Sequence, residues 1–193
     1  MAKDLIQIRW HGRGGQGAKT AAGMVATVAV KDGQNAQAAP EYGAEREGAP
    51  IKAYTRISSD PIRVHDAIYY PSVVLVLDDS LLETENVEDG LEEDGILLVN
   101  TKMSPEEVRE QLGLEGRTIY TIDATGIALD EIGRPIPNTV MIGALGKVTG
   151  TLTPDAIKKS IRKKFEAKLS EGMLEGNMRA VERAFEEVKS ENE

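Results

Sequence analysis

The chain has 193 residues, 40% of them hydrophobic, which is enough to build one well-cored domain. Its formal net charge of -9 argues against a nucleic-acid partner, and no apolar stretch approaches the ~20 residues that span a membrane. The sequence has no cysteine, only two histidines and no apolar signal segment at its start. We therefore expect a cytoplasmic protein without a cysteine-ligated iron–sulfur cluster or a histidine-rich metal site.

The first elements are a predicted strand and a predicted buried helix. Residues 5–10 form an apolar run, and a glycine-rich loop follows at once. Residues 18–30 are apolar on nearly every face, which is typical of a helix that packs closely on a sheet. Residues 34–39 give a weaker strand signal, and residues 40–50 form a charged loop bounded by prolines.

The next segments predict a hairpin and a central strand. Residues 51–58 alternate between apolar and polar side chains, which indicates a half-buried strand, and "SSDP" then turns the chain toward a second strand at 62–64. Residues 72–80 are an unbroken apolar run ending in two aspartates, as expected of a parallel strand covered on both faces. The acidic segment 82–94 is expected to be an exposed helix or loop.

The second half alternates strands with helices. Residues 95–100 and 118–123 are short apolar strands, and Ser104 precedes a helix start with an early proline and two glutamates. Residues 138–149 form a helix of small residues, and two amphipathic helices occupy about 153–190.

This order predicts a single α/β domain over residues 1–193. We expect an open, mostly parallel sheet flanked by helices in three layers, similar to a Rossmann fold, with C-terminal helices. The sheet and its helices would occupy about 5–150, followed by a helical tail at about 153–190.

The glycine loop lies in "RWHGRGGQGAKT", and its first interpretation is a dinucleotide site. Gly12, Gly14 and Gly17 satisfy G-x-G-x-x-G between a strand and a helix, whose N-terminus attracts phosphate. Glu41 lies far enough along the chain to reach a ribose. The weak second strand and the lack of a Tyr-x-x-x-Lys pair argue against a stand-alone nicotinamide enzyme.

Two other interpretations compete. The spacing from Gly12 to Gly17 also approaches a P-loop, but Lys19 comes one residue late, and one residue rotates a side chain by roughly 100° around a helix. We therefore expect Lys19 to point away from the loop. The glycines could instead serve only a tight turn. Arg13 favours an anion, because it adds a fixed charge where amides converge.

Five segments in order and spacing resemble the gamma subunit of the pyruvate:ferredoxin oxidoreductase family and its 2-oxoacid relatives. The likeness runs from about Leu5 to about Gly150 and rests on "RWHGRGGQGAKTAA", "PEYGAEREGAPIKAYTRIS", "VVLVLDDSLLE", "EDGILLVNT" and "IPNTVMIGALGKVTG". The resemblance implies a complex that converts pyruvate and coenzyme A to acetyl-CoA and carbon dioxide, or the reverse, with ferredoxin as electron carrier. Alternatives are a 2-oxoisovalerate or 2-oxoglutarate version of the complex, or a free-standing dinucleotide-binding oxidoreductase.

The resemblance also implies a division of labour. Thiamine diphosphate, Mg²⁺ and iron–sulfur clusters are expected in partner alpha, beta and ferredoxin-like delta subunits only, and this chain alone is expected to be inactive, with no catalytic or metal-binding residue. Coenzyme A is the ligand that this chain would contact. We hypothesise that the amides of Gly14, Gly15 and Gly17 grip phosphate oxygens together with Arg13. The full candidate set is Gly12, Arg13, Gly14, Gly15, Gln16, Gly17 and Arg46.

Several other polar residues have two interpretations each. Arg46 could meet an anion or a catalytic subunit, or it could form local ion pairs with Glu41 and Glu45. Asn138 is expected to cap a helix, with ligand contact as the alternative. Asp78 and Asp79 end a strand where ligand loops gather, although solvated acids are the simpler explanation.

The remaining candidates carry less chemistry. His11 adjoins the loop, whereas His65 has no evident partner. The basic run from 158 to 164 could attract an acidic ferredoxin, but a solvated helix face is the simpler interpretation.

Overall fold

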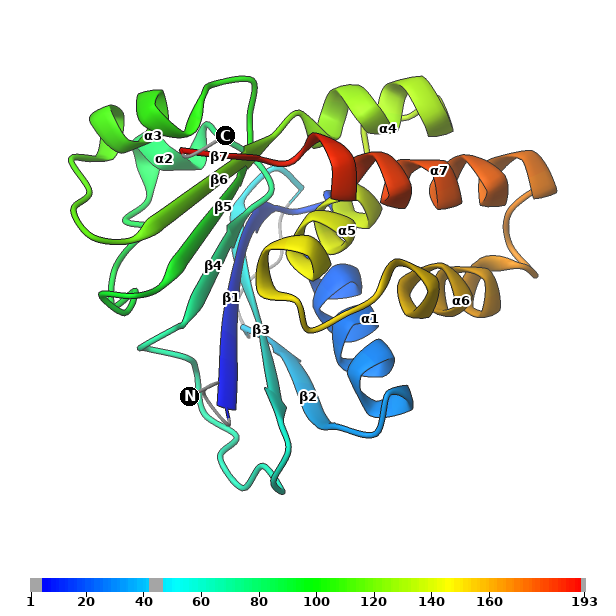
Figure 1. Ribbon diagram of the computed structural model, residues 1–193, viewed down its shortest axis with the longest axis horizontal. Helices are drawn as coiled ribbons and strands as arrows, with labels where there is room; N and C mark the ends of the chain where they lie inside the picture. Colours follow the sequence, from blue (N-terminus) through cyan, green and yellow to red (C-terminus); the bar gives the residue numbers. More distant parts are fainter. Residues whose placement is uncertain (1–4, 42–46, 192–193) are drawn as a thin grey trace.

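The protein forms one seven-stranded sheet, seen in a computed structural model that describes residues 5–41 and 47–191 (Figure 1). The strand order is β2-β3-β1-β4-β5-β6-β7, and the pairs β1–β4, β4–β5 and β5–β6 are parallel. The outer pairs are antiparallel. The predicted open α/β sheet is confirmed, with its parallel part in the centre. The strands are β1 Leu5–Arg13, β2 Asn35–Pro40, β3 Pro50–Ser58, β4 Val73–Val76, β5 Ile96–Asn100, β6 Thr118–Ile122 and β7 Lys189–Ser190.

Helices cover both faces of the sheet, which confirms the three layers. Figure 1 shows α1, α5, α6 and α7 together on one side, with α2 and α3 on the other. Each side has its own buried apolar cluster. No helix among the described residues is both long and apolar enough to cross a membrane. The helices are α1 Ala18–Lys31, α2 Leu81–Thr84, α3 Pro105–Leu112, α4 Ala124–Ile132, α5 Asn138–Thr149, α6 Pro154–Phe165 and α7 Glu171–Glu187.

The helix starts fall into two groups. A side-chain oxygen at the N-cap accepts a backbone N–H in α3, α4, α6 and α7, through Ser104, Asp123, Thr153 and Ser170. In α3 this is the predicted cap, and Glu107 completes it by accepting from the Ser104 amide at 2.7 Å. Helices α1, α2 and α5 have no side-chain cap. The N-cap residues of these helices therefore leave the first amides to other partners, and in α5 the Thr139 amide finds one in Asn138 Oδ1.

The predicted hairpin after residue 58 is wrong. Residues 62–64 form no strand, and β3 instead pairs with β1 on one side and β2 on the other. β3 is also more deeply buried than its alternation predicts, since every residue from Ala53 to Ser58 is buried. Polar Thr55 fits there because its hydroxyl accepts from Trp10 Nε1 at 3.0 Å and donates to the Ala22 carbonyl.

Three further segments differ from the prediction. The acidic segment 82–94 buries its apolar residues Leu82, Val87 and Leu91 under the sheet, so it is not simply exposed. Helix α4 and the short strand β7 were not predicted. Both depend on distant segments, because α4 packs against α7 and β7 pairs with β6.

Substitution of Gly176 tests the packing of α7 on α4. A Cβ at this position would lie 2.1 Å from the Glu131 carbonyl oxygen, whereas a Cβ at exposed Gly172 on the same helix meets nothing within 4 Å. We expect Gly176→Ala to lower the free energy of unfolding by about 1–3 kcal/mol through overpacking. Gly172→Ala should be neutral or stabilise by up to about 1 kcal/mol through helix propensity. Urea denaturation of both variants measures this, and equal effects would contradict the packing.

Candidate functional site

The glycine loop is a tight turn between β1 and α1. β1 continues three residues beyond its predicted end, so Gly12 pairs with Ile51 of β3 and lies in the strand. The Gln16 amide donates to the Arg13 carbonyl at 3.1 Å and closes the turn. Gly15 and Gly17 have φ angles of 97° and 84°, a region that favours glycine. The reversal of the chain therefore requires glycine at these two positions.

Gly17 also brings two helix N-termini together. It is the N-cap of α1, and its carbonyl accepts the first helical bond from the Ala21 amide at 2.9 Å. A Cβ at Gly17 would lie 2.6 Å from Asn138 Nδ2 and would displace that side chain, and the φ angle of 84° also favours glycine here. The positive ends of α1 and α5 adjoin one another at this contact.

The prediction that Asn138 caps α5 is wrong. Pro137 occupies the N-cap position, and a proline side chain cannot accept a hydrogen bond. Asn138 is instead the first helical residue, and its Oδ1 accepts from the Thr139 amide at 2.7 Å. Its side-chain nitrogen faces Gly17.

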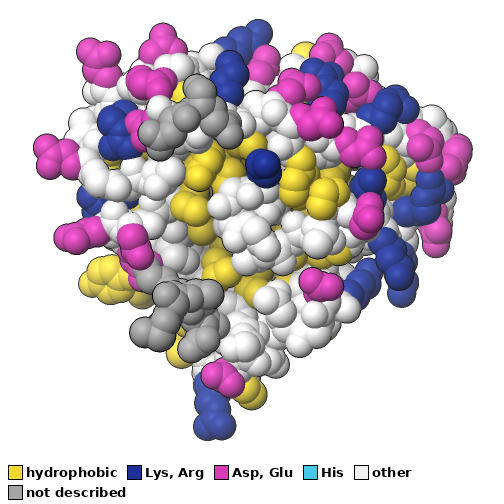
Figure 2. Space-filling model, viewed as in Figure 1, with side chains coloured by type: hydrophobic (Ala, Val, Ile, Leu, Met, Phe, Trp, Pro, Cys, Tyr) yellow, Lys and Arg dark blue, Asp and Glu magenta, His cyan; other side chains and the backbone are white. Residues whose placement is uncertain are grey.

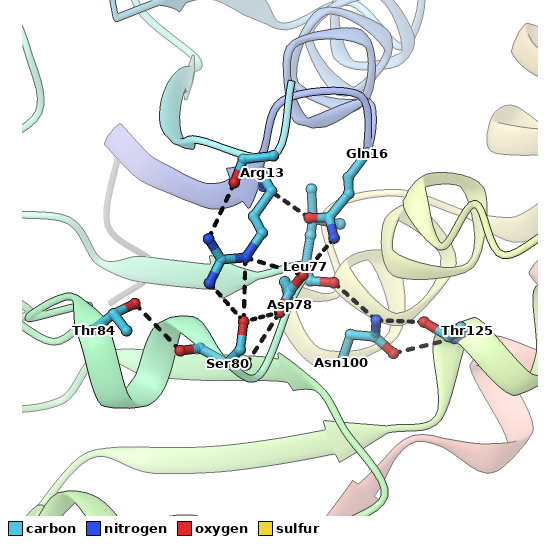
Figure 3. Close-up of polar contacts among 9 residues, drawn as sticks. Arg13, Gln16, Leu77, Asp78, Ser80, Thr84, Asn100 and Thr125 are labelled. Carbon is cyan, nitrogen blue, oxygen red and sulfur yellow. Dashed lines mark hydrogen bonds and ion pairs between the residues drawn. The ribbon is translucent and has the colours of Figure 1, made fainter. Parts of the chain in front are cut away.

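Arg13 and Gln16 both reach across to the end of β4 (Figure 3). Arg13 donates from Nη2 to Ser80 Oγ at 2.8 Å, and its Nε lies 3.5 Å from Asp78 Oδ2. Gln16 donates to the same carboxylate at 2.6 Å and accepts from the Arg13 amide at 2.8 Å. Arg13 also donates to the Gly48 carbonyl at 3.1 Å. These bonds fix the turn to the residues that follow β4, and Arg13, the only arginine of the turn, is bound to Ser80 and Asp78.

The Asp78 carboxylate is the centre of this network. Burial raises the pKa of Asp78, but hydrogen bonds from Ser80 and Gln16 and the charge of Arg13 lower it more. The net effect holds the pKa of Asp78 below its ordinary value, so the carboxylate is ionised at neutral pH. Asp79 beside it accepts from the Thr101 hydroxyl at 2.8 Å. Asp78 is therefore not merely a solvated acid, whereas Asp79 is exposed, as that interpretation expects.

Two hollows flank the turn. One, of about 510 Å³, is lined by Gly15, Gly17, Lys19 and Glu47, among others. Lys19 borders this hollow and is exposed, and the predicted direction of its side chain stays a prediction. The second, of about 310 Å³, also includes Gly15 and Gly17 but is mostly apolar. Its lining includes Ile136, Phe165 and Leu169 together with Arg134 and Asn138.

The backbone amides of the turn differ in their availability. The Gly14 amide donates to the Ala49 carbonyl at 2.9 Å, so it is already used. Among the described residues, no acceptor bonds to the amides of Gly15 and Gly17. Arg46, with Tyr42 and Glu45, lies outside the described residues.

A family model described as pyruvate ferredoxin/flavodoxin oxidoreductase matches residues 7–187 of this chain. The chain belongs to this family. It is 52% identical over 189 residues to the pyruvate synthase subunit PorC of Thermotoga maritima, covering 98% of this chain and 97% of that protein. A crystal structure of the T. maritima subunit superposes with a TM-score of 0.87 and 47% identity, over 98% of this chain and 99% of that one.

A further relative shows what kind of member it is, and a more distant structure shares the fold. The chain is 50% identical over 157 residues to the pyruvate/ketoisovalerate oxidoreductases common subunit gamma of Thermococcus kodakarensis, covering 81% of this chain and 85% of that protein. It shares its fold with part of the 2-oxoglutarate:ferredoxin oxidoreductase of Magnetococcus marinus, with a TM-score of 0.76 and 20% identity over 94% of this chain and 30% of that one. The protein is a gamma subunit of a multi-subunit 2-oxoacid:ferredoxin oxidoreductase.

The topology of the gamma subunit argues separately against a dinucleotide enzyme. In a dinucleotide fold the second strand lies parallel and next to the first and ends in the ribose-binding acid. Here β1 lies between antiparallel β3 and parallel β4, and β2 is separated from β1 by β3. Glu41, which follows β2, therefore lies two strands away from the glycine turn.

Asn100, at the end of β5, joins the end of β4 to the start of α4. Asn100 donates to the Leu77 carbonyl at 2.9 Å and to Thr125 Oγ1 at 2.8 Å, and it accepts from the Thr125 amide at 3.1 Å (Figure 3). Asn100, Leu77 and Thr125 border a hollow of about 610 Å³, whose lining also includes Gln16 and Asp78. Asn100 has no local signal in the sequence, because its partners lie 23 and 25 residues away.

His11 is buried and has a structural partner. Its Nε2 accepts from Arg9 Nε at 3.0 Å. Burial, with the nearby charges of Arg9 and Lys52, lowers the pKa of His11 to about 3. A histidine that stays neutral at pH 7 and already accepts a hydrogen bond is not suited to proton transfer in this pH range.

The basic run on α6 is partly neutralised. Lys158 pairs with Glu182 at 2.8 Å, and Arg162 pairs with Glu171 at 2.8 Å and with Glu175. Figure 2 shows dark blue and magenta side chains intermixed on this side of the molecule. The ion pairs tie α6 to α7, in agreement with a solvated helix face.

Replacement of Asp78 by Asn tests the network that pins the turn. Because the folded-state pKa lies below the ordinary value, ionised Asp78 stabilises the fold at neutral pH, and this contribution is lost as the pH falls through the folded pKa. We expect Asp78→Asn to lower the free energy of unfolding by about 1 kcal/mol at pH 7. The difference from the unmodified chain should shrink below about pH 4.

Urea denaturation between pH 7 and pH 3.5 measures this difference. Asp60→Asn, at an exposed aspartate after β3, is the matched control and should have little effect at any pH. A stability difference for Asp78→Asn that stays constant down to pH 3.5 would contradict the network.

Proposed function

We propose that this gamma subunit holds the phosphate-bearing part of coenzyme A at the glycine turn while partner subunits perform the chemistry. The complex would be cytoplasmic and would oxidise pyruvate to acetyl-CoA and carbon dioxide with reduction of ferredoxin, or run the reverse synthesis. Partner alpha, beta and delta subunits would carry thiamine diphosphate, Mg²⁺ and the iron–sulfur clusters. The lack of cysteine in this chain agrees with that division.

The observation that carries the proposal is the meeting of two uncapped helix N-termini at Gly17 and Asn138. Helix N-termini present unsatisfied N–H groups and a positive dipole end, which favour phosphate. The amides of Gly15 and Gly17 have no acceptor among the described residues, and they border both hollows. The phosphates would lie against these amides.

The second hollow supports a ligand that is larger than a phosphate. Its apolar lining by Ile136, Phe165 and Leu169 suits a flat, weakly polar group such as adenine. Arg134 at the same hollow supplies a fixed charge for a further phosphate. Coenzyme A combines these chemical groups, and the Magnetococcus marinus structure is described with coenzyme A bound.

Arg13, Gln16 and Gly12 have positioning roles in this proposal. Arg13 would have to leave Ser80 and Asp78 to grip a phosphate, whereas in place it fixes the shape of the turn. Gly14 would contribute through its bond to Ala49, and Arg46 stays in the proposed set as a source of positive charge. Pyruvate is the proposed 2-oxo acid. The Thermococcus kodakarensis relative, named for pyruvate and ketoisovalerate, makes a branched 2-oxo acid the second candidate.

Substitution of Thr20 tests the ligand site in the assembled complex. Thr20 borders both hollows on the first turn of α1. A glutamate there stabilises the helix by about 0.3–1 kcal/mol but places a negative charge beside the proposed phosphates. We expect Thr20→Glu to weaken coenzyme A binding at least about tenfold, or roughly 1.4 kcal/mol, in calorimetric titration.

Two further variants provide a control for Thr20→Glu and a second test of the ligand site. Thr27→Glu makes the same change at an exposed position later in α1 and should leave the affinity unchanged. Arg13→Ala should weaken binding as the turn loses its tie to Asp78. If Thr20→Glu and Arg13→Ala both assemble normally and bind coenzyme A with unchanged affinity, the ligand does not bind at the turn.

A further inference from the structure

The strand β2 leaves one edge of the sheet open. β2 pairs with β3 on its inner side, and it stands at the end of the strand order (Figure 1). Among the described residues, no strand pairs with its outer side. An edge strand presents alternate backbone N–H and C=O groups that are free to pair with another extended chain.

The composition of β2 does not protect this edge. Its six residues, "NAQAAP", include no charged side chain, and its only strand-breaking residue is the final Pro40. Proteins usually block exposed edges with lysine, bulges or very short strands. The opposite edge of this sheet follows that rule, because β7 has only two residues and one is Lys189. The open edge at β2 is therefore the unusual one.

Exposed apolar side chains lie on both sides of β2. Val30, near the end of α1, is 53% exposed, and α1 packs along β2 (Figure 1). Val64 is 50% exposed, and its carbonyl accepts a hydrogen bond from the Gln37 side chain. A strand added to β2 would direct alternate side chains toward Val30 on one face and toward Val64 on the other.

The charge of the chain indicates which occupant fits. Two copies paired through β2 would bring together chains that each carry a net charge of -9, which disfavours self-association. The gamma subunit belongs instead to a multi-subunit complex. We propose that the outer edge of β2 receives an extended segment of a partner subunit, uncharged or basic, with apolar side chains at alternate positions. Main-chain hydrogen bonds would provide the affinity, and the contacts at Val30 and Val64 the register.

The proposal is tested by measuring backbone amide hydrogen exchange of β2 in the isolated full-length chain and in the purified complex. We expect peptides covering Asn35–Pro40 to exchange at least about tenfold more slowly in the complex, because an added strand protects the outward amides. Amides of β5, which lies inside the sheet, are the internal reference and should not change. The isolated chain should be a monomer by light scattering.

A charge placed on the edge provides the second measurement. Ala38 is exposed, so Ala38→Lys should leave the fold and its melting temperature unchanged but weaken assembly at least about tenfold. Ala167→Lys makes the same change at an exposed position away from the edge and should assemble normally.

Three results would overturn the proposal. The exchange of β2 could be the same in the isolated chain and in the complex, or folded Ala38→Lys could assemble like the unmodified chain. A dimer of the isolated chain with β2 already protected would show that a second copy is the occupant. None of these results depends on coenzyme A binding, so this proposal and the ligand site fail independently.

Discussion

The site depends on one packing constraint, the close approach of α1 and α5 at Gly17. The chain must reverse within four residues between a buried strand and a buried helix, and positive φ angles at Gly15 and Gly17 make that reversal. With no side chain at Gly17, Asn138 fits directly against the turn. Because a glycine and a proline hold the two N-cap positions, no N-cap side chain satisfies the first amides of either helix, and in α5 the Thr139 amide bonds instead to Asn138 Oδ1. The same contact that packs the helices thus creates a surface that favours anions.

The sequence predicted those elements whose signals lie within one segment. The buried helix α1, the central strand β4 and the Ser104 cap each depend on local pattern, and each was predicted correctly. Failures occurred where a distant partner decides the structure. The alternating pattern of β3 predicts a half-buried strand, but β3 pairs with β1 on one side and β2 on the other and is buried. Helix α4, "ATGIALDEI", was not predicted, because its structure depends on the Asp123 cap and on packing against α7.

At the site, too, the residue types could be read from the sequence, but their contacts with distant residues could not. The glycines and the charge of Arg13 were visible in the sequence, but the bonds of Arg13 to Ser80 span 67 residues and have no local signature. For this reason the sequence indicates a cation available to an anion at Arg13, whereas in the structure Ser80 and Asp78 hold this side chain. Asn138 was misplaced for a similar reason, since nothing in "IPNT" indicates that proline takes the cap and asparagine faces a glycine turn 121 residues away.

The sheet gives a physical reason for proposing a ligand turn and a partner edge on the same subunit. β1, which ends in the turn, pairs with β3 over nine residues, and β3 pairs with β2 over six. A hydrogen-bonded ladder therefore joins the glycine turn to the open edge, and such a ladder does not flex like a loop. A partner segment bound to β2 would fix the position of the turn relative to the catalytic chains. Because a small misplacement of a reacting group costs a large factor in rate, rigid attachment at β2 would matter to the ligand site proposed at the glycine turn.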